Sequence, residues 1–373
     1  MRVGVILLAA ALTAFGQRHR IDSVDTEKPG GKLLQQALQE NDPARKAAAL
    51  ELFANQFPKD PATAAVLEML QGIYVKTSDP DKVIATGERL IAVDPDDPEP
   101  ALQSLKAAEA RKDLTLIKKW SNITSGNARK MAGAPQPSEA DQVETWKQNV
   151  DYAKQVDNYA DYALFRAAVE SRDPKVTIDF LETLEQRSPQ SEYVTKGRES
   201  LFVAYRQSGS ADKALALAER VLATDQSNED MLLVVTDHYL QSKTEPEKVH
   251  AYSAKIVELM AAKAKPQGAS DADWTARKNL VVGLAHYMDG KLYYNEGRFP
   301  QADQELRRAL PLVEGNATLK PEVLYLLGFA NYKLEKPQDA ADFYKECAAI
   351  KSAFQATAAK NLQGIKTQYH GIR

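Results

Sequence analysis

The 373-residue sequence has very few residues of the types that form disulfides or metal sites. It contains a single cysteine, Cys347, so no disulfide can form within the chain. A lone cysteine is more often a small buried apolar residue than a nucleophile. The five histidines are scattered, and no two of them have the three- or four-residue spacing that places two metal ligands on one helix face. We therefore expect neither a metal nor another cofactor.

The sequence also lacks an excess of positive charge. Lys and Arg number 48 against 51 Asp and Glu, which gives a formal net charge of −3. Proteins that bind nucleic acids need clustered basic side chains to displace counterions from phosphates. We expect no nucleic-acid partner.

No catalytic motif is present in the chain. It has no Walker phosphate loop, no HExxH zinc motif, no G-x-S-x-G nucleophile elbow and no CxxC. The segment 94–100, DPDDPEP, collects carboxylates, but its prolines and its lack of a turn glycine depart from a calcium loop. A turn between repeats explains this segment better, and we expect the protein not to be an enzyme.

Long apolar runs are absent, and the longest one lies at the N-terminus. Residues 3–15 are almost entirely apolar, follow Arg2 and precede Gly16. A bilayer span needs about 20 apolar residues, whereas this pattern is typical of a secretory signal. We predict a signal peptide over residues 1–16 with cleavage after Gly16; an uncleaved anchor is the alternative.

Export follows from this signal. We expect a periplasmic or secreted protein, of bacterial origin, with no stable membrane span after cleavage. Residues 17–31 resemble a flexible lead-in, because Pro29, Gly30 and Gly31 are typical of a break in regular structure.

The rest of the chain repeats one pattern. Tyr205 precedes Ala214 by nine residues, and Tyr293 precedes Ala302 by nine. Tyr205 and Tyr239 lie 34 residues apart. Within each copy the apolar positions recur every three or four residues, which predicts a helix, a short turn and a second helix.

These copies resemble the tetratricopeptide repeat (TPR), a helix–turn–helix unit. The resemblance implies that Ala302 lets the two helices approach closely and that Gly297 takes the left-handed conformation that ends the first helix. The matching residues are Gly290, Tyr293, Gly297, Ala302 and Ala309; Leu327, Gly328, Ala340 and Tyr344; Tyr205, Ala214 and Ala218; and Leu70, Tyr74 and Pro95.

The resemblance predicts an all-α protein, an α-solenoid of about eight antiparallel helix pairs in a right-handed TPR-like superhelix, closed by a C-terminal capping helix. The predicted segments are degenerate pairs over 32–131, an atypical middle pair with a Pro/Gly loop over 132–190, TPR units over 191–350, and a capping helix with a tail over 351–373.

In TPR arrays the first helix of each unit lines a concave groove that holds partner segments. Tyr325, Phe329 and Tyr332 have i, i+4, i+7 spacing and form one aromatic stripe, which is the residue type that anchors interfaces. Packing of this stripe against the capping helix is the structural alternative. The predicted groove residues are Tyr287, Lys291, Tyr294, Asn295, Tyr325, Phe329, Tyr332 and Lys333.

One departure from the TPR pattern lies close to this face. Asp289 stands where the family has a large apolar residue, and His286 precedes it by three. The two are expected to form either a local hydrogen bond or a buried polar pair that takes part in recognition.

Three functional hypotheses remain. The first is a non-catalytic exported scaffold that binds a protein or peptide segment in the groove, in envelope assembly or maintenance. The second is a small-molecule or glycan site, or an unrecognised enzyme, in the aromatic-rich region 132–190. The third is self-association into a homo-oligomer through the aromatic stripe. The aromatic residues behind the second hypothesis are Trp146, Tyr152, Tyr159, Tyr162 and Phe165.

Overall fold

The computed structural model describes residues 5–7, 18–21, 23–369 and 372. Among these residues are seventeen α-helices, one short 3-10 helix and a two-stranded antiparallel sheet. The chain divides into two compact units, Met1–Gly209 and Ser210–Arg373. The predicted signal segment 1–16 lies outside the described residues, apart from the strand residues 5–7, so cleavage after Gly16 stays a prediction.

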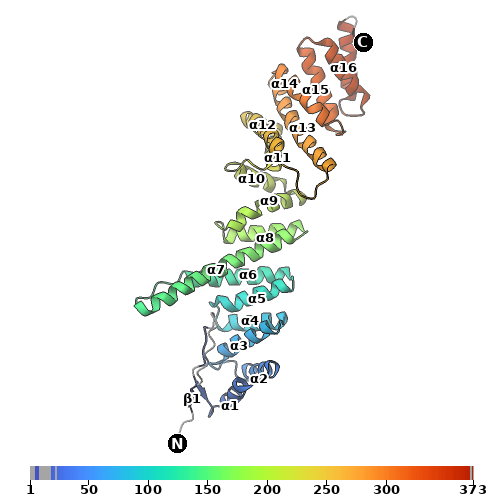
Figure 1. Ribbon diagram of the computed structural model, residues 1–373. Helices are drawn as coiled ribbons and strands as arrows, with labels where there is room; N and C mark the ends of the chain where they lie inside the picture. Colours follow the sequence, from blue (N-terminus) through green and yellow to red (C-terminus); the bar gives the residue numbers. More distant parts are fainter. Residues whose placement is uncertain (1–4, 8–17, 22, 370–371, 373) are drawn as a thin grey trace. The chain divides into compact units, whose positions relative to one another are not determined.

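Unit 1 is a stack of helices in which each helix packs against the next (Figure 1). Strand β1 (Val5–Leu7) pairs antiparallel with β2 (Ser23–Asp25) ahead of this stack. The helices are α1 (Pro29–Gln39), α2 (Pro43–Gln56), α3 (Thr63–Lys76), α4 (Pro80–Val93), α5 (Pro98–Ala110), α6 (Leu114–Ala132), α7 (Ala140–Glu170), α8 (Pro174–Arg187) and α9 (Glu192–Gln207).

Unit 2 continues the same pattern, again with contacts between consecutive helices. A short 3-10 helix, η1 (Leu310–Leu312), follows the second helix of one pair. The helices are α10 (Ala211–Leu222), α11 (Glu229–Ser242), α12 (Pro246–Ala262), α13 (Asp271–Asn295), α14 (Phe299–Ala309), α15 (Leu319–Lys333), α16 (Pro337–Ala349) and α17 (Gln355–Gln368).

Several first helices of pairs also contact the first helix of a neighbouring pair. In unit 1, α5 touches both α3 and α7, and in unit 2, α13 touches both α11 and α15. First helices of successive pairs therefore lie in one layer, which is the arrangement of an α-solenoid. The predicted all-α fold of helix pairs followed by a closing helix is confirmed; the right-handed twist stays a prediction.

Four helices of unit 1 begin with the same dipeptide, Asp-Pro. The aspartate carboxylate accepts a backbone N–H from the first turn, which would otherwise lack a partner. The proline occupies a position whose missing N–H costs nothing. The capping pairs are Asp42 to Arg45, Asp79 to Lys82, Asp97 to Glu99 and Asp173 to Lys175.

The turns inside the pairs place one residue in the left-handed region. Gly297 has a φ of +74°, as predicted, and Lys112 at the break between α5 and α6 has a φ of +55°. Glu335 replaces the glycine in the next pair and has a φ of +56°. The turn geometry is thus kept even where the sequence does not supply a glycine.

The first helix begins earlier than the predicted lead-in allows. Pro29, Gly30 and Gly31 form the first turn of α1 and do not interrupt regular structure. A Cβ added to Gly31 would lie 1.8 Å from the carbonyl oxygen of Asp25, and one added to Gly30 would lie 3.1 Å from the ring of Phe53. The two glycines are needed for close packing. The prediction of a break in regular structure at these residues is therefore wrong, because it considered only their turn propensity.

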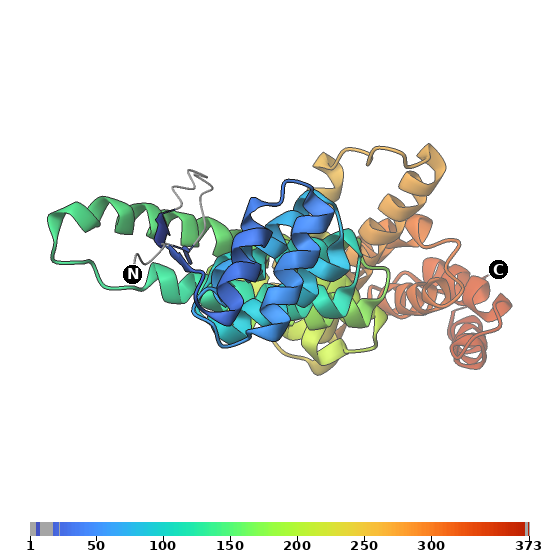
Figure 2. The same cartoon turned by 90° about the horizontal axis from the view of Figure 1, so that it is seen from below.

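Helix α7 is the longest helix among the described residues, with 31 residues. Its N-terminal part projects beyond the neighbouring helices of unit 1 in two views (Figures 1 and 2). Its buried side chains begin only at Ala153. The first three turns of α7 are therefore available to form one wall of a surface site.

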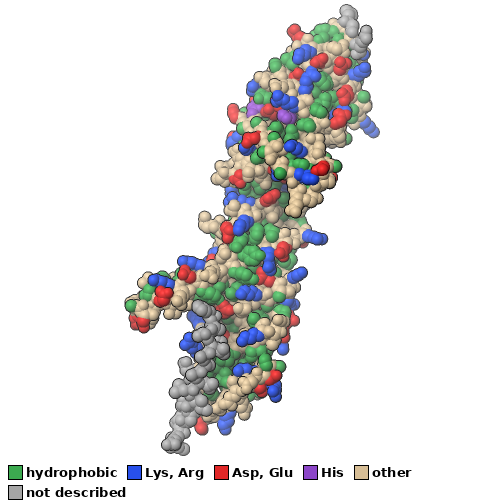
Figure 3. Space-filling model, in the orientation of Figure 1, with side chains coloured by type: hydrophobic (Ala, Val, Ile, Leu, Met, Phe, Trp, Pro, Cys, Tyr) green, Lys and Arg blue, Asp and Glu red, His purple; other side chains and the backbone are tan. Residues whose placement is uncertain are grey.

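The described helices include none long and apolar enough to cross a membrane. Basic and acidic side chains are interleaved on the face that Figure 3 shows, without a large patch of one sign. This distribution agrees with the absence of an excess of positive charge.

Candidate functional site

The predicted groove residues lie on α13 and α15 in unit 2. Tyr287 is 5% exposed, and its hydroxyl accepts a hydrogen bond from Lys291 Nζ at 3.0 Å. Lys291 Nζ also donates to Glu322 Oε1 of α15 at 2.8 Å. Burial disfavours the charge on Lys291, but its bonds to Glu322 and Tyr287 outweigh this effect and raise the pKa of the ammonium group. Tyr287 and Lys291 thus join two helices and are already engaged with each other.

An aromatic cluster lies next to this pair. The ring of Phe329 lies 5.3 Å from that of Tyr294 and 5.9 Å from that of Phe299, all three being half-buried. Lys333 is exposed, and its ammonium group lies 5.4 Å from the centre of the Phe329 ring. Asn295 is exposed at the end of α13. These residues form the accessible part of the predicted groove.

The other two residues of the stripe face the last helix. Tyr325 packs its ring 5.3 Å from that of Phe354, which precedes α17, and 5.8 Å from that of Tyr344. The hydroxyl of Tyr332 donates to Gln368 Oε1 of α17 at 3.2 Å. The structural alternative for the stripe therefore holds for Tyr325 and Tyr332, while Phe329 packs towards α13.

His286 and Asp289 do not pair with each other. His286 Nδ1 lies 2.7 Å from Glu305 Oε2 of α14, whereas Asp289 is hydrogen-bonded to His250 of α12. Burial raises the pKa of Asp289, and His250 counteracts this effect. The two expected partners are separated because α13 lies between α12 and α14, and each side chain turns towards a different neighbour.

The aromatic residues of the middle region contact different neighbouring segments and do not gather in one site. The hydroxyl of Tyr159 donates to Glu109 Oε2 at 2.6 Å. Tyr162 and Phe165 place their rings 5.6 and 5.5 Å from that of Tyr193 on α9. Trp146 Nε1 donates to the carbonyl of Ala134 at 2.9 Å. Contacts with neighbouring segments thus account for these four residues, whereas the fifth, Tyr152, lines a cavity of unit 1.

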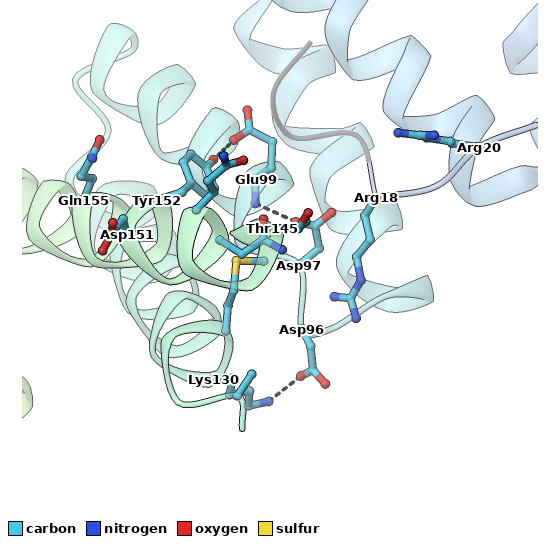
Figure 4. A pocket seen from close by; sticks show the side chains of 14 residues that line it. Arg18, Arg20, Asp96, Asp97, Glu99, Lys130, Thr145, Asp151, Tyr152 and Gln155 are labelled. Carbon is cyan, nitrogen blue, oxygen red and sulfur yellow. Dashed lines mark hydrogen bonds and ion pairs between the residues drawn. The ribbon is translucent and has the colours of Figure 1, made fainter. Parts of the chain in front are cut away.

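This cavity lies in unit 1, between the projecting part of α7 and the segment that leads into α5 (Figure 4). Its volume is about 950 Å³. Tyr152 donates its hydroxyl proton to Glu99, and burial followed by the charge of Glu99 raises the pKa of the phenol. Lys130 Nζ bonds Asp96 Oδ1 at 2.7 Å on the opposite side. The remaining walls carry mainly amide, hydroxyl and charged side chains, so the cavity suits a polar molecule.

The least exposed charged residue of the cavity is Asp97, at 3% exposure. Its Oδ1 accepts the backbone N–H of Glu99 at 3.0 Å (Figure 4). Burial raises the pKa of Asp97 to about 6. Glu68 and His19 lie beside it, with His19 Nδ1 2.6 Å from Glu68 Oε1.

The sequence did not point to this group of residues. The turn predicted for residues 94–100 ends at Asp97, which is the N-cap residue of α5. Nothing local relates it to Glu68 or to His19, which are separated from it by 29 and 78 residues. The three residues come together because α3 contacts α5 and the chain before β2 places His19 beside Glu68 and Asp97.

Comparisons with known proteins add little to this geometry. No protein-family model matches the chain, and no curated protein matches it. Among solved structures, the TPR domain of P58(IPK) matches 92% of this chain and 100% of its own, at 12% sequence identity and a TM-score of 0.27. That score is too low to support an inference about family or function. The α-solenoid is established by the helices of this chain and their successive contacts.

Proposed function

We propose that the protein is a non-catalytic scaffold that binds a protein or peptide segment on the face formed by α13 and α15. The observation that supports this most strongly is the half-buried cluster of Tyr294, Phe299 and Phe329, with the exposed Lys333 beside it. Aromatic side chains of this kind anchor interfaces because they contribute much area at low entropic cost. We name this surface the α13–α15 face: Tyr287, Lys291, Tyr294, Asn295, Tyr325, Phe329, Tyr332 and Lys333.

The face favours a segment with an apolar side chain next to a carboxylate. The apolar side chain would contact the rings of Tyr294 and Phe329, and the carboxylate would pair with Lys333. Lys291 is less suited to this role, because Glu322 already neutralises it. Tyr325 packs against Phe354 and Tyr332 is hydrogen-bonded to Gln368 of α17, so these two residues do not need to touch the partner.

The location of this function follows from the N-terminal sequence. We propose that the protein acts outside the cytoplasm, in envelope assembly or maintenance, after cleavage behind Gly16. N-terminal sequencing of the protein from cell fractions would test this: a mature chain that starts at Gln17 supports export, and an intact Met1 in the cytoplasm contradicts it.

The binding function can be tested with selected peptides. Peptides would be selected from a random library on the immobilised protein, and their affinities measured by fluorescence anisotropy. Lys333→Glu should lower the affinity for a selected peptide with acidic and apolar residues at least tenfold. Lys345→Glu is the matched control, since Lys345 is an exposed lysine of the second helix of the same pair. Equal affinity of the wild type and Lys333→Glu would show that the α13–α15 face is not the binding site.

The cavity of unit 1 supports a second candidate function, the binding of a polar small molecule or glycan. Its volume of about 950 Å³ is within the range of ligand pockets. A thermal-shift screen would detect such a ligand, because binding to the native state raises the melting temperature. Loss of this shift in Gln148→Ala, which alters the cavity wall, would place the ligand there. A shift that persists unchanged in Gln148→Ala would contradict this placement.

A further inference from the structure

Three side chains of the types that bind metal ions meet at one point of unit 1. His19 precedes β2, Glu68 lies on α3, and Asp97 is the residue before α5. One potential ligand atom from each residue lies within 4.8 Å of the other two. The three come from separate parts of the chain, so their proximity is a product of the fold.

Asp97 provides an independent sign that a ligand belongs here. Its residue is 3% exposed, and its Oδ1 already caps α5 by accepting the N–H of Glu99. Its Oδ2 is buried and has no hydrogen-bond partner among the described residues. A buried carboxylate oxygen without a partner is costly, and a cation bound to Oδ2 would remove this cost without disturbing the cap.

The surroundings of His19 fit a metal ligand. Its Nδ1 lies 2.6 Å from Glu68 Oε1, and its Nε2 lies 3.5 Å from Asp94 Oδ2. Metal-bound histidines commonly donate their second ring N–H to a carboxylate, which fixes the tautomer and the ring orientation. Asp94 is placed to receive that proton when Nδ1 faces the cation.

We propose that His19, Glu68 and Asp97 bind one divalent transition-metal ion of the zinc class. One imidazole and two carboxylates match the ligand set of such ions, whereas calcium and magnesium prefer oxygen alone. Bonds of about 2.0–2.2 Å place two ligand atoms of a tetrahedral ion about 3.3–3.6 Å apart, and the three candidate ligand atoms here lie within 4.8 Å of one another. Small side-chain rotations therefore complete the site, and the neighbouring cavity, which Asp97 lines, leaves a position for water.

The ion pair of His19 with Glu68 is a competing explanation for part of this geometry. It accounts for the 2.6 Å contact but leaves Asp97 Oδ2 without a partner. The ion pair does not involve Asp97, whereas the metal site requires it. A variant of Asp97 therefore distinguishes the two explanations.

Calorimetric titration of the tag-free, metal-stripped full chain with zinc chloride tests the proposal. The wild type should bind one Zn²⁺ per chain and melt at a higher temperature with the metal. His19→Ala and Asp97→Asn should each weaken binding at least tenfold. Asp97→Asn keeps an oxygen for the helix cap, so circular dichroism should show it folded. Co²⁺ in place of Zn²⁺ should give the visible absorption bands that are typical of a four-coordinate site in the wild type, and these bands should be absent in His19→Ala and Asp97→Asn.

Asp96→Asn serves as the matched control, because Asp96 lies next to Asp97 but pairs with Lys130 at the surface. Its affinity for Zn²⁺ should stay within twofold of the wild type. Absence of stoichiometric zinc binding in the wild type, or equal binding in His19→Ala and Asp97→Asn, would overturn the proposal.

Discussion

Gly328 of α15 lies directly against the ring of Tyr344 on α16: a Cβ added to this glycine would lie 2.7 Å from Tyr344 Cδ1. The same relationship recurs one pair earlier, where a Cβ on Gly290 would lie 2.8 Å from Leu306 Cγ on α14. In both pairs the first helix presents a bare backbone to a large side chain of the second. The distance between the paired helices is set at these points.

Gly328→Ala should therefore destabilise unit 2, because the ring of Tyr344 cannot move without disturbing the core around α17. Overpacking of this kind costs about 1–3 kcal/mol. Gly364→Ala on α17 is the control, since its added Cβ would have no atom within 4 Å apart from its chain neighbours and the backbone of its own helix. Alanine there should stabilise the helix by about 0.5–1 kcal/mol. Urea unfolding of both variants measures the two effects, and equal shifts would contradict the packing explanation.

The left-handed turn residues give a second prediction. Glu335→Gly should stabilise the protein slightly, by up to about 1 kcal/mol, because a glycine adopts its φ of +56° without a steric penalty. Gly297→Ala should destabilise the protein by a similar amount, since Gly297 has a φ of +74°. Differential scanning calorimetry should show opposite shifts in melting temperature. Shifts of the same sign would indicate that the turns do not determine stability.

A buried polar network joins α14 and α15. Asn331 is fully buried; its Nδ2 donates to Asp303 Oδ1 at 2.6 Å, and its Oδ1 accepts from Arg307 at 3.1 Å. Asn331→Ala leaves buried groups without partners, which costs about 1–3 kcal/mol. Asn295→Ala at an exposed position should change the free energy of unfolding by less than about 0.5 kcal/mol. Chemical denaturation of both variants compares them, and an equally mild effect of Asn331→Ala would show that the network is dispensable.

The burial of Cys347 predicts a dependence on pH. Burial raises the pKa of this thiol to about 11 from its ordinary value near 9. The folded chain then holds a proton that the unfolded chain loses, so the contribution of Cys347 to stability falls as the pH rises from about 9 to about 11.

The same burial should protect the thiol from alkylation. Iodoacetamide at pH 8 should leave Cys347 unmodified in the native protein and modify it in denaturant, as measured by mass spectrometry. Cys347→Ala should remove the thiol contribution to the pH dependence between 9 and 11. Rapid alkylation of the native protein would contradict the buried position, and an unchanged pH profile in Cys347→Ala would contradict the assigned contribution.

The helix pairs could be predicted because their signals are local. Apolar spacing and turn residues such as Gly297 each act within a few residues, and both agree with the structure. The contacts of the predicted face could not be predicted from the sequence in the same way. Whether Tyr332 faces a partner or α17 depends on where the last helix docks, and the spacing of the stripe is the same in either case.

The cluster around Asp97 could not be predicted from local patterns either, because it depends on contacts between segments that are far apart in the sequence. Its burial and the unpartnered Oδ2 arise from the stacking of α3 on α5 and from the position of His19. Pro29 to Gly31 illustrate a related difficulty, since glycines that serve close packing look the same in sequence as glycines that serve turns.

The central claim is that the α13–α15 face receives a protein segment, and site-specific photo-crosslinking in the cells that make the protein tests it most directly. A photoreactive phenylalanine analogue would replace Asn295, an exposed residue of the face, or Lys345 on α16 as the control. We predict a discrete adduct with another polypeptide from position 295 and none from position 345. No adduct from position 295, or the same adducts from both positions, would contradict the claim.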